Sequence, residues 1–270
     1  MSDHAKQFRA LHQGPTPLIL ANAWDAGSAR LIESLGAKAI ATTSAGVDWT
    51  LGYPDGNLLP VAKLAEVVAQ MARVIDIPLT VDFEAGYSDD PAAVAENIKP
   101  LLDAGAVGIN LEDGGDPPAL LAAKIERLKQ TASARGVDLF INARTDVYLR
   151  GLVPEEKRVS ESLARAKIYQ SAGADGLFVP AAIQEAAIRE IAAGTDLPVN
   201  VLVRPGLAPA KDLGTWGVRR LSCGSGIAQM MWGYVSSLTR GFLDKGESGP
   251  LLDSDMPYGE LQTLFSSVSK

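Results

Sequence analysis

Cysteine and histidine are almost absent from this chain. The single cysteine, Cys223, cannot form an internal disulfide and is expected to be a small buried side chain rather than a nucleophile. The two histidines, His4 and His12, both precede the first expected strand. Zinc sites and mechanisms with a histidine general base therefore lose the residue on which they usually depend.

Long apolar runs and an excess of positive charge are absent as well. No run approaches the roughly 20 apolar residues needed to cross a bilayer, and residues 1–20 lack the pattern of a signal peptide. We therefore expect a cytoplasmic protein without a membrane partner. The 25 Lys and Arg stand against 32 Asp and Glu, so the net charge of −7 leaves no basic stripe for a nucleic acid.

Two further groups of catalytic importance are missing. No lysine lies at the end of an expected strand, which disfavours an aldolase that forms a Schiff base. No Walker-type glycine-rich motif is present, and Gly224-Ser225-Gly226 is too short to indicate a phosphate site. The polar residues that do follow the expected strands are mostly acidic.

Short apolar runs alternate with stretches of helical period along the whole chain. Continuous apolar runs are typical of parallel strands that helices cover on both faces, and 270 residues suit one closed barrel of about 250. We predict an α/β fold in which residues 1–270 form a single (β/α)₈ TIM barrel. The expected strands are Leu18–Ala21, Ala39–Thr42, Leu79–Asp82, Gly108–Leu111, Leu139–Ala143, Gly176–Val179, Val199–Leu202 and Arg220–Ser222.

Glycine and proline mark the helix ends. Leu35-Gly36-Ala37, Ala104-Gly105-Ala106 and Ala172-Gly173-Ala174 each precede a strand, where a helix ends in a left-handed residue. Asp89-Asp90-Pro91 supplies an N-cap and a first-turn proline for a helix over 91–104. Pro100 predicts a kink within that helix.

Two segments do not fit a minimal barrel. The connection Thr43–Pro60 is long for a loop between a strand and a helix, and we expect a lid or a wall of the substrate site there. The C-terminal helical segment, from about 224 to 270, includes the apolar stretch Leu261–Phe265, which has no obvious partner in a completed barrel. We expect this segment to pack on a neighbouring subunit.

Three carboxylates follow neighbouring strands. Asp82 and Glu84 come after the third expected strand, and Glu112 comes after the fourth. In a barrel they would converge on one rim, where three like charges could not all stay ionised without a cation. Oxygen ligands suit Mg²⁺, and Mn²⁺ could replace it. The alternative is that these residues are solvated loop acids or helix caps.

Other polar residues extend this rim. Arg144, after the fifth strand, offers a rigid fork for a carboxylate or an enolate oxygen, unless it pairs only with Asp146 or Glu112. The small residues Ser44, Ala45 and Gly46 would let backbone N–H groups approach a carboxylate, although they could also form a plain tight turn. Three more residues, which follow the first expected strand, complete the polar ring: Asn22, Trp24 and Asp25. Trp24 could instead serve only in packing.

Several of these segments resemble the isocitrate lyase/phosphoenolpyruvate mutase superfamily over about residues 15–240. The resemblance implies a Mg²⁺-dependent barrel, often a homotetramer with exchanged C-terminal helices, that acts on small 2-oxo or 2-hydroxy acids through an enolate-like state. It also implies that Asp82, Glu84 and Glu112 form the metal cluster, that Ser44 to Gly46 with Arg144 clamp the substrate, and that Asn200 contacts it. The motifs are Asn22–Arg30, Thr42–Gly46, Val81–Tyr87, Glu112-Asp113 and Ala143–Asp146.

The chain departs from this pattern after the fourth strand. The isocitrate and methylisocitrate lyases carry a Lys-Lys-Cys-Gly-His-type motif there, and the mutase and phosphonopyruvate hydrolase branch carries a lysine-rich loop with an Asn or Thr. Here the segment Glu112–Pro118 has neither. The proton donor is therefore open, with Tyr53 and Asp55 on the long connection, or Tyr87, as candidates.

These observations lead to one function and two rivals. We expect a Mg²⁺-dependent lyase that breaks a C–C or P–C bond next to the carbonyl of a small 2-oxo or 2-hydroxy carboxylic acid, with Arg144, Glu112, Tyr53 and Asp55 as catalytic residues. The first rival is a 2-oxo acid decarboxylase or hydrolase of the same superfamily. The second is a paralogue that binds a 2-oxo acid without turnover.

Overall fold

A parallel barrel forms the body of the molecule in the computed structural model, which describes residues 3–266. Within these residues nine strands pair in the order β1-β9-β8-β7-β6-β5-β4-β3-β2, all parallel. The strands are β1 Leu18–Leu20, β2 Asn22–Ala23, β3 Ile40–Thr42, β4 Leu79–Asp82, β5 Gly108–Glu112, β6 Phe140–Arg144, β7 Gly176–Phe178, β8 Val199–Leu202 and β9 Val218–Ser222.

The predicted strands and barrel are confirmed. The first expected run is split in two, because β1 pairs with β9 whereas β2, one residue further along, pairs with β3. The ends of the strand order are thus two parts of one continuous segment around Ala21. This segment joins the two edges of the sheet, so that the barrel is nearly closed.

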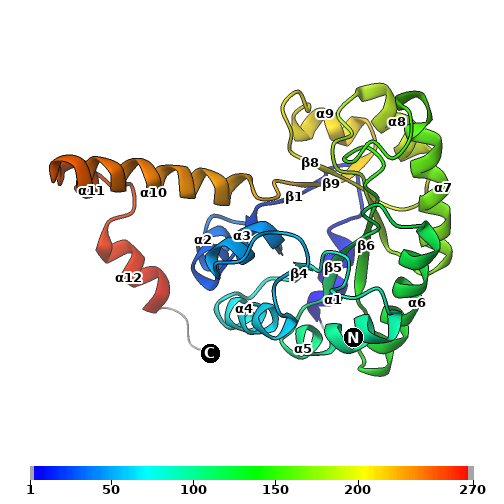
Figure 1. Cartoon of the computed structure of the whole chain (residues 1–270), viewed down its shortest axis with the longest axis horizontal. Helices are drawn as coiled ribbons and strands as arrows, with labels where there is room; N and C mark the ends of the chain where they lie inside the picture. Colours follow the sequence, from blue (N-terminus) through cyan, green and yellow to red (C-terminus); the bar gives the residue numbers. More distant parts are fainter. Residues whose placement is uncertain (1–2, 267–270) are drawn as a thin grey trace.

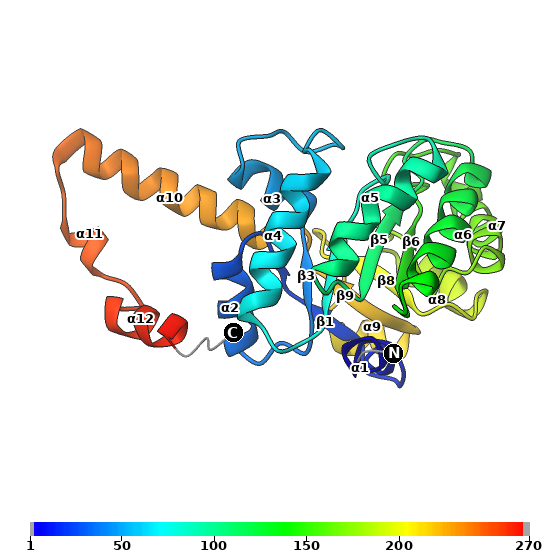
Figure 2. The same ribbon diagram turned by 90° about the horizontal axis from the view of Figure 1, so that it is seen from below.

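Helices wrap the outside of the barrel and successive ones pack on each other (Figures 1 and 2). The helices are α1 Asp3–Ala10, α2 Ala26–Ser34, α3 Ser44–Thr50, α4 Val61–Val74, α5 Pro91–Asp103, α6 Pro118–Ala134, the 3₁₀ turn η1 Glu155–Lys157, α7 Arg158–Ser171, α8 Glu185–Ala193, α9 Ala210–Thr215, α10 Gly226–Lys245, α11 Gly249–Leu252 and α12 Tyr258–Ser266. No helix among residues 3–266 is long and apolar enough to cross a membrane.

The predicted helix boundaries have the expected chemistry. Asp90 caps α5 by accepting a hydrogen bond from Ala92 N at 2.9 Å, and Pro100 lies inside that helix. The glycines of the three repeated tripeptides, Gly36, Gly105 and Gly173, have φ of +94°, +104° and +103°. Only glycine adopts this conformation without steric cost, so these positions end helices cleanly before the next strand.

Helix α1 covers the amino ends of the strands. Phe8 is fully buried, and a Cβ on Gly108 in β5 would lie 2.7 Å from its ring. Arg9 donates to Asp138 and Asp175, which lie within two residues of the starts of β6 and β7. The bottom of the barrel is therefore closed, and chemistry is left to the carboxyl ends of the strands.

The C-terminal segment leaves the barrel. Helix α10 packs its first turns on the body, where Ala228 is buried, and then projects away from it (Figure 1). Helix α12 returns to lie against α2, and Arg30 Nε donates to Leu264 O at 3.3 Å. Of the predicted segment 224–270, residues 267–270 lie outside the described residues. Packing of this segment on a neighbouring subunit stays a prediction.

Candidate active site

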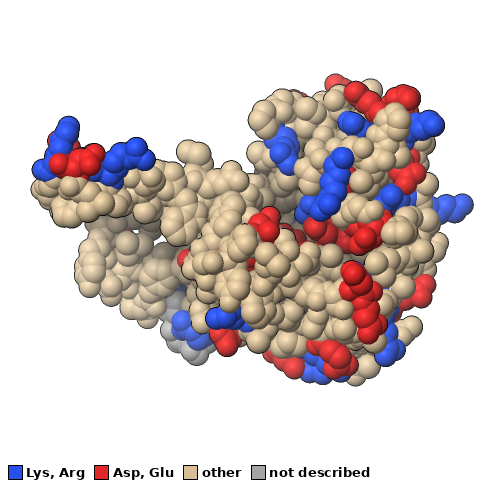
Figure 3. Space-filling view, viewed as in Figure 1, with Lys and Arg blue, Asp and Glu red and all other residues tan. Residues whose placement is uncertain are grey.

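The carboxyl ends of three neighbouring strands carry the predicted acids and arginine. Asp82 ends β4, Glu112 ends β5 and Arg144 ends β6. Strand register sets Glu112 beside Arg144, and Asp82 beside Asn110, which is two residues before Glu112. In the space-filling view acidic side chains gather in a hollow near the middle of this face, with basic ones beside them (Figure 3). The topology thus brings the three side chains to one rim.

The Arg144 guanidinium is held by two carboxylates. Its Nη1 lies 2.6 Å from Glu112 Oε2, and its Nε and Nη2 donate to the two oxygens of Asp146 at 2.7 and 3.1 Å. Burial acts to lower the pKa of Arg144, but Glu112 and Asp146 raise it above the usual value. The structural pairing considered from the sequence is present, and it fixes the plane of the fork that an anion would meet.

Glu112 has little contact with water. Its side chain is 12% exposed, and burial raises its pKa to about 8, although Arg144 acts to lower it. Asp82, Asp146 and Glu84 add to the increase by repulsion. Burial and the neighbouring acids therefore both disfavour the charged form of Glu112.

Glu84 lies in a turn with unusual backbone geometry. Glu84 and Tyr87 have φ of +48° and +60°, a region that residues other than glycine seldom adopt and that is typical of functional sites. Asn57 holds this turn, because its backbone N donates to Glu84 Oε2 and its Oδ1 accepts from Ala85 N at 3.1 Å. Lys124 Nζ donates to Ala85 O at 2.8 Å from the other side.

The segment Ser44 to Gly46 is helical. The sequence suggested an anion nest or a tight turn, and a loop from Thr43 to Pro60, but the first part of that connection is helix α3. Thr43 precedes the helix in an extended conformation, so the chain turns into α3 at once after β3. Ser44 N, a first-turn N–H without an intrahelical acceptor, donates to Asp82 Oδ2 at 3.2 Å. The small residues are thus at a helix start that faces the rim.

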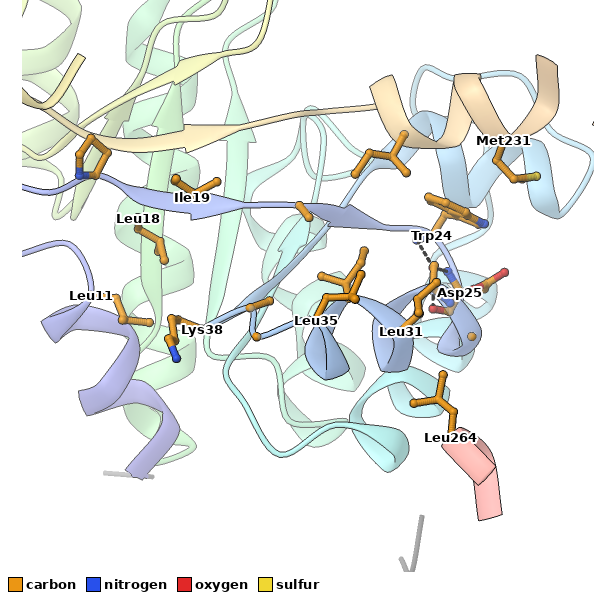
Figure 4. A pocket seen from close by; sticks show the side chains of 18 of the residues that line it. Leu11, Leu18, Ile19, Trp24, Asp25, Leu31, Leu35, Lys38, Met231 and Leu264 are labelled. Carbon is orange, nitrogen blue, oxygen red and sulfur yellow. Dashed lines mark hydrogen bonds between the residues drawn. The ribbon is translucent and has the colours of Figure 1, made fainter. Parts of the chain in front are cut away.

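Gly46 is small for a packing reason. A Cβ there would lie 2.7 Å from Thr43 Cγ2, 2.9 Å from Trp24 Cβ and 3.3 Å from Ala228 Cβ. Trp24 is 9% exposed and belongs to the hydrophobic core. It also lines a largely apolar groove of about 1160 Å³ between β1, α2, α10 and α12 (Figure 4). Packing, which the sequence left as the alternative for Trp24, accounts for this position.

The three remaining predicted residues have different surroundings. Asn200 is fully buried, and its amide exchanges long hydrogen bonds of 3.3 and 3.4 Å with Ser222 Oγ. Tyr53 packs against the hydrophobic core, and its backbone N donates to Asp48 O. Asp55 is exposed, yet its charge raises the pKa values of Glu84 and Asp48. Asp55 is therefore electrically coupled to the rim.

Sequence reasoning missed Asp48 in α3. Its side chain is fully buried, and neither of its carboxylate oxygens has a partner among the described residues. Burial, followed by Glu84, Asp55 and Asp82, raises its pKa to about 7. The available signal was an acid between Val47 and Trp49 in a segment otherwise rich in small and apolar residues.

Asp113, the residue after Glu112, was noted from the sequence only as part of a motif and was given no role. Its Oδ1 accepts from Asp146 N at 2.9 Å, and its Oδ2 accepts from Tyr169 Oη at 2.6 Å and Arg165 Nη1 at 2.8 Å. Asp113 therefore ties the end of β5 to the segment that carries Arg144 and to helix α7. It aligns the rim without being exposed on it.

The donor set fits Mg²⁺. No group of three or more His, Cys, Asp or Glu within residues 3–266 could hold a metal ion directly. Mg²⁺ usually takes only one or two carboxylates and keeps several waters, so such a group is not required. Glu84 Oε1 is buried and has no partner among the described residues, as is true of both oxygens of Asp48. A cation near these oxygens would satisfy them and reduce the repulsion among the acids.

Comparison with known proteins gives matches over most of the chain. The family model of phosphoenolpyruvate phosphomutase matches residues 8–243. An oxaloacetate decarboxylase of Bradyrhizobium sp. (strain ORS 278) is 32% identical over 205 residues, which cover 73% of this chain and 69% of that protein. The 2-methylisocitrate lyase of Escherichia coli (strain K12) is 30% identical over 217 residues, with coverages of 74% and 70%.

A solved structure shares the fold. The structure of a phosphonopyruvate hydrolase in complex with oxalate and Mg²⁺ has a TM-score of 0.84 to this chain and 20% sequence identity. The match covers 97% of this chain and 95% of that one. The two proteins therefore share their fold.

Proposed function

The chain belongs to the isocitrate lyase/phosphoenolpyruvate mutase superfamily, and we propose that it is a Mg²⁺-dependent lyase. It breaks a C–C or P–C bond next to the carbonyl of a small 2-oxo or 2-hydroxy carboxylic acid, through an enolate-like intermediate. One observation carries the proposal. An arginine fork held by carboxylates lies beside a group of acids that repel one another, at the ends of adjacent strands.

The proposal gives each rim residue a task. Asp82, Glu84 and Glu112 would hold Mg²⁺, or Mn²⁺, chiefly through water. Bound there, the cation would supply positive charge to a substrate oxygen that becomes negative as the neighbouring bond breaks. Arg144, held in plane by Asp146, would bind the substrate carboxylate or the developing enolate oxygen.

Substrate contacts come from two further elements. The first turn of α3, Ser44 to Gly46, presents backbone N–H groups at the rim, and Ser44 N already donates to an acidic oxygen there. Trp24 packs directly behind Gly46 and would keep this turn in place. Asn200 lies within the barrel and would contact the substrate only if its bonds to Ser222 opened.

We assign proton transfer to the part of the connection Thr43–Pro60 that follows α3, which we call the lid. Residues 51–60 follow α3, and Asn57 attaches them to the turn at Glu84. Asp55 on this lid affects the pKa values of buried acids, which supports a role close to the reacting atoms. Tyr53 is the second candidate on the lid. Tyr87 is a weaker proton donor, since burial and Glu84 raise its pKa far above the usual range.

We also propose a homotetramer whose C-terminal segment, residues 224–270, packs on a neighbouring subunit. Large apolar side chains are exposed on this segment of the single chain, among them Met230 at 75%, Leu243 at 76% and Leu252 at 82%. Exposed apolar surface of this kind is typical of subunit interfaces. The single cysteine is compatible with the reducing cytoplasm, where we place the protein.

The test is turnover of a defined panel. The purified chain with Mg²⁺ would be incubated with oxaloacetate, isocitrate, methylisocitrate, phosphonopyruvate and phosphoenolpyruvate, and each would be followed by NMR. We expect loss of one compound that stops with EDTA and in Asp82→Ala. Full activity in Asp82→Ala or Arg144→Ala would refute the proposed site.

Product analysis separates the rivals. A lyase releases two acids, whereas a decarboxylase releases CO₂ and a hydrolase transfers a group to water. The similarity to an oxaloacetate decarboxylase makes decarboxylation the second candidate. Mg²⁺-dependent binding of a 2-oxo acid without loss of any compound would favour the binder.

A further inference from the structure

A second arginine lies inside the barrel, where the proposed mechanism does not use it. Arg220 in β9 is 1% exposed, and its Nη2 donates to Asn110 Oδ1 in β5 at 3.1 Å. Asn110 Oδ1 also accepts from Asn142 Nδ2 at 2.9 Å. Because β9 and β5 lie on opposite sides in the strand order, the bond from Arg220 crosses the barrel interior.

The Arg220 charge is not neutralised by an ion pair. Its Nε and Nη1 have no hydrogen-bond partner among residues 3–266, and none of the ion pairs between these residues includes it. Burial lowers its pKa to about 9, and the charge of Asp82 opposes this decrease. A buried cation without a carboxylate partner costs stability, so another benefit should offset it.

Arg220 lies directly beneath the rim. Its partner Asn110 is the register neighbour of Asp82, and Asn142 is two residues before Arg144 on β6. The layer of Asn110, Asn142 and Arg220 is therefore the first one below the rim side chains. A positive charge in this layer acts on any anion at the rim through an interior of low polarizability, which screens it weakly.

We propose that Arg220 is a specificity-determining residue that favours doubly charged over singly charged carboxylate ligands at the rim. It acts from below through its field and through the position of Asn110, without touching the ligand. The interaction energy of a fixed charge with a ligand is proportional to the ligand's charge. Loss of the Arg220 charge therefore weakens the binding of a monoanion by some factor, and the binding of a dianion by about the square of that factor.

The experiment measures two ligands on full-length variants. Because the inference rests on the proposed function, the probes are oxalate, a planar dianion that mimics the enolate of pyruvate, and pyruvate, a monoanion. Calorimetric titration with Mg²⁺ at low ionic strength compares the wild type with Arg220→Met, Arg220→Gln and Arg220→Lys. We expect both neutral variants to bind oxalate about 10-fold and pyruvate about 3-fold more weakly, and Arg220→Lys to restore most of both losses.

A neighbouring arginine provides the matched control. Arg219 is in the same strand but points outward, where its Nη1 donates to the backbone oxygens of Gly214 and Val218. Arg219→Met removes the same charge and should leave both affinities unchanged. Arg220→Met should also melt at or above the wild-type temperature, since a well-packed apolar side chain relieves an unpaired buried charge.

The outcomes distinguish this inference from the proposed function. Equal fold losses for oxalate and pyruvate, or unchanged oxalate affinity in both neutral variants, would overturn the inference while the proposed function stands. If the neutral variants do not fold and Arg220→Lys does not bind, the side chain is structural and the inference is wrong. If the wild type binds no oxalate with Mg²⁺, the proposed function and the inference fail together.

Discussion

Removal of the Asp113 carboxylate should destabilise the whole barrel. This side chain is fully buried and accepts three hydrogen bonds, from Asp146 N at 2.9 Å, Arg165 Nη1 at 2.8 Å and Tyr169 Oη at 2.6 Å. Asp113→Ala leaves Arg165 Nη1, a buried phenol and a buried amide without this acceptor, whereas Arg165 Nε keeps its ion pair with Glu161. A buried donor that loses its acceptor costs about 1–3 kcal/mol, so the three donors together should cost about 3–5 kcal/mol of unfolding free energy.

The assay is urea unfolding followed by circular dichroism. In thermal unfolding, a chain of this size loses about 2–4 °C in melting temperature per kcal/mol. The melting temperature of Asp113→Ala should therefore fall by on the order of 10 °C. Asp113→Asn keeps one acceptor for Asp146 N and should lose about half as much free energy. The control Asp116→Ala changes an exposed acid in the same loop and should cost less than about 0.5 kcal/mol. A cost below about 1 kcal/mol for Asp113→Ala would refute this reasoning.

Three further predictions concern pH, the rim and a close packing contact. Burial, opposed by the bond to Phe8 O, lowers the pKa of His12 to about 3, and the charges of Arg220 and Arg9 add to this. The folded state keeps His12 neutral while the unfolded state binds a proton, so His12 contributes a loss of up to about 1.4 kcal/mol of unfolding free energy per pH unit below about pH 6. The raised pKa values of Glu112 and Asp48 contribute the opposite slope, so the contribution of His12 is the difference between the wild type and His12→Phe in urea unfolding. His12→Phe should remove this contribution, and the same pH dependence in both proteins would show that His12 does not supply it. Arg144→Lys keeps the charge but loses the fork, and kcat/KM for the substrate found should fall about 10- to 100-fold; a smaller loss would contradict bidentate binding. Gly86→Ala should destabilise by about 1–3 kcal/mol more than Gly52→Ala in urea unfolding, because both have positive φ but only Gly86 would place a Cβ 2.7 Å from Val94 Cγ1. Equal losses would show that this contact relaxes.

The rim residues could be predicted from the sequence because each of them lies at the end of a recognisable apolar run. Each apolar run is short and continuous, which indicates a buried parallel strand. Because parallel strands run in the same direction, the residues after the runs meet at one end of the barrel. Asp82, Glu112 and Arg144 follow from these two facts alone. The connection Thr43–Pro60 was marked as unusual by its length, but its first part is helix α3, since Ser44 to Thr50 contain no strong helix breaker apart from Gly46.

The supporting residues could not be predicted in the same way. Asp113 takes its partners from β6 and α7, up to 56 residues along the chain, and no sequence pattern specifies that meeting. Asp48 becomes significant only because α3 buries it close to the rim acids. Arg220 reads as one of two adjacent arginines, and only the alternation of β9 decides which of them enters the barrel.

The most direct measurement is a crystal structure of the chain with Mn²⁺ and oxalate, with data collected to locate manganese by its anomalous scattering. The account predicts one manganese peak at the rim, surrounded by Asp82, Glu84 and Glu112, with oxalate between the ion and the Arg144 guanidinium. Manganese that binds elsewhere while the rim stays empty, or oxalate bound without contact to Arg144, would contradict it.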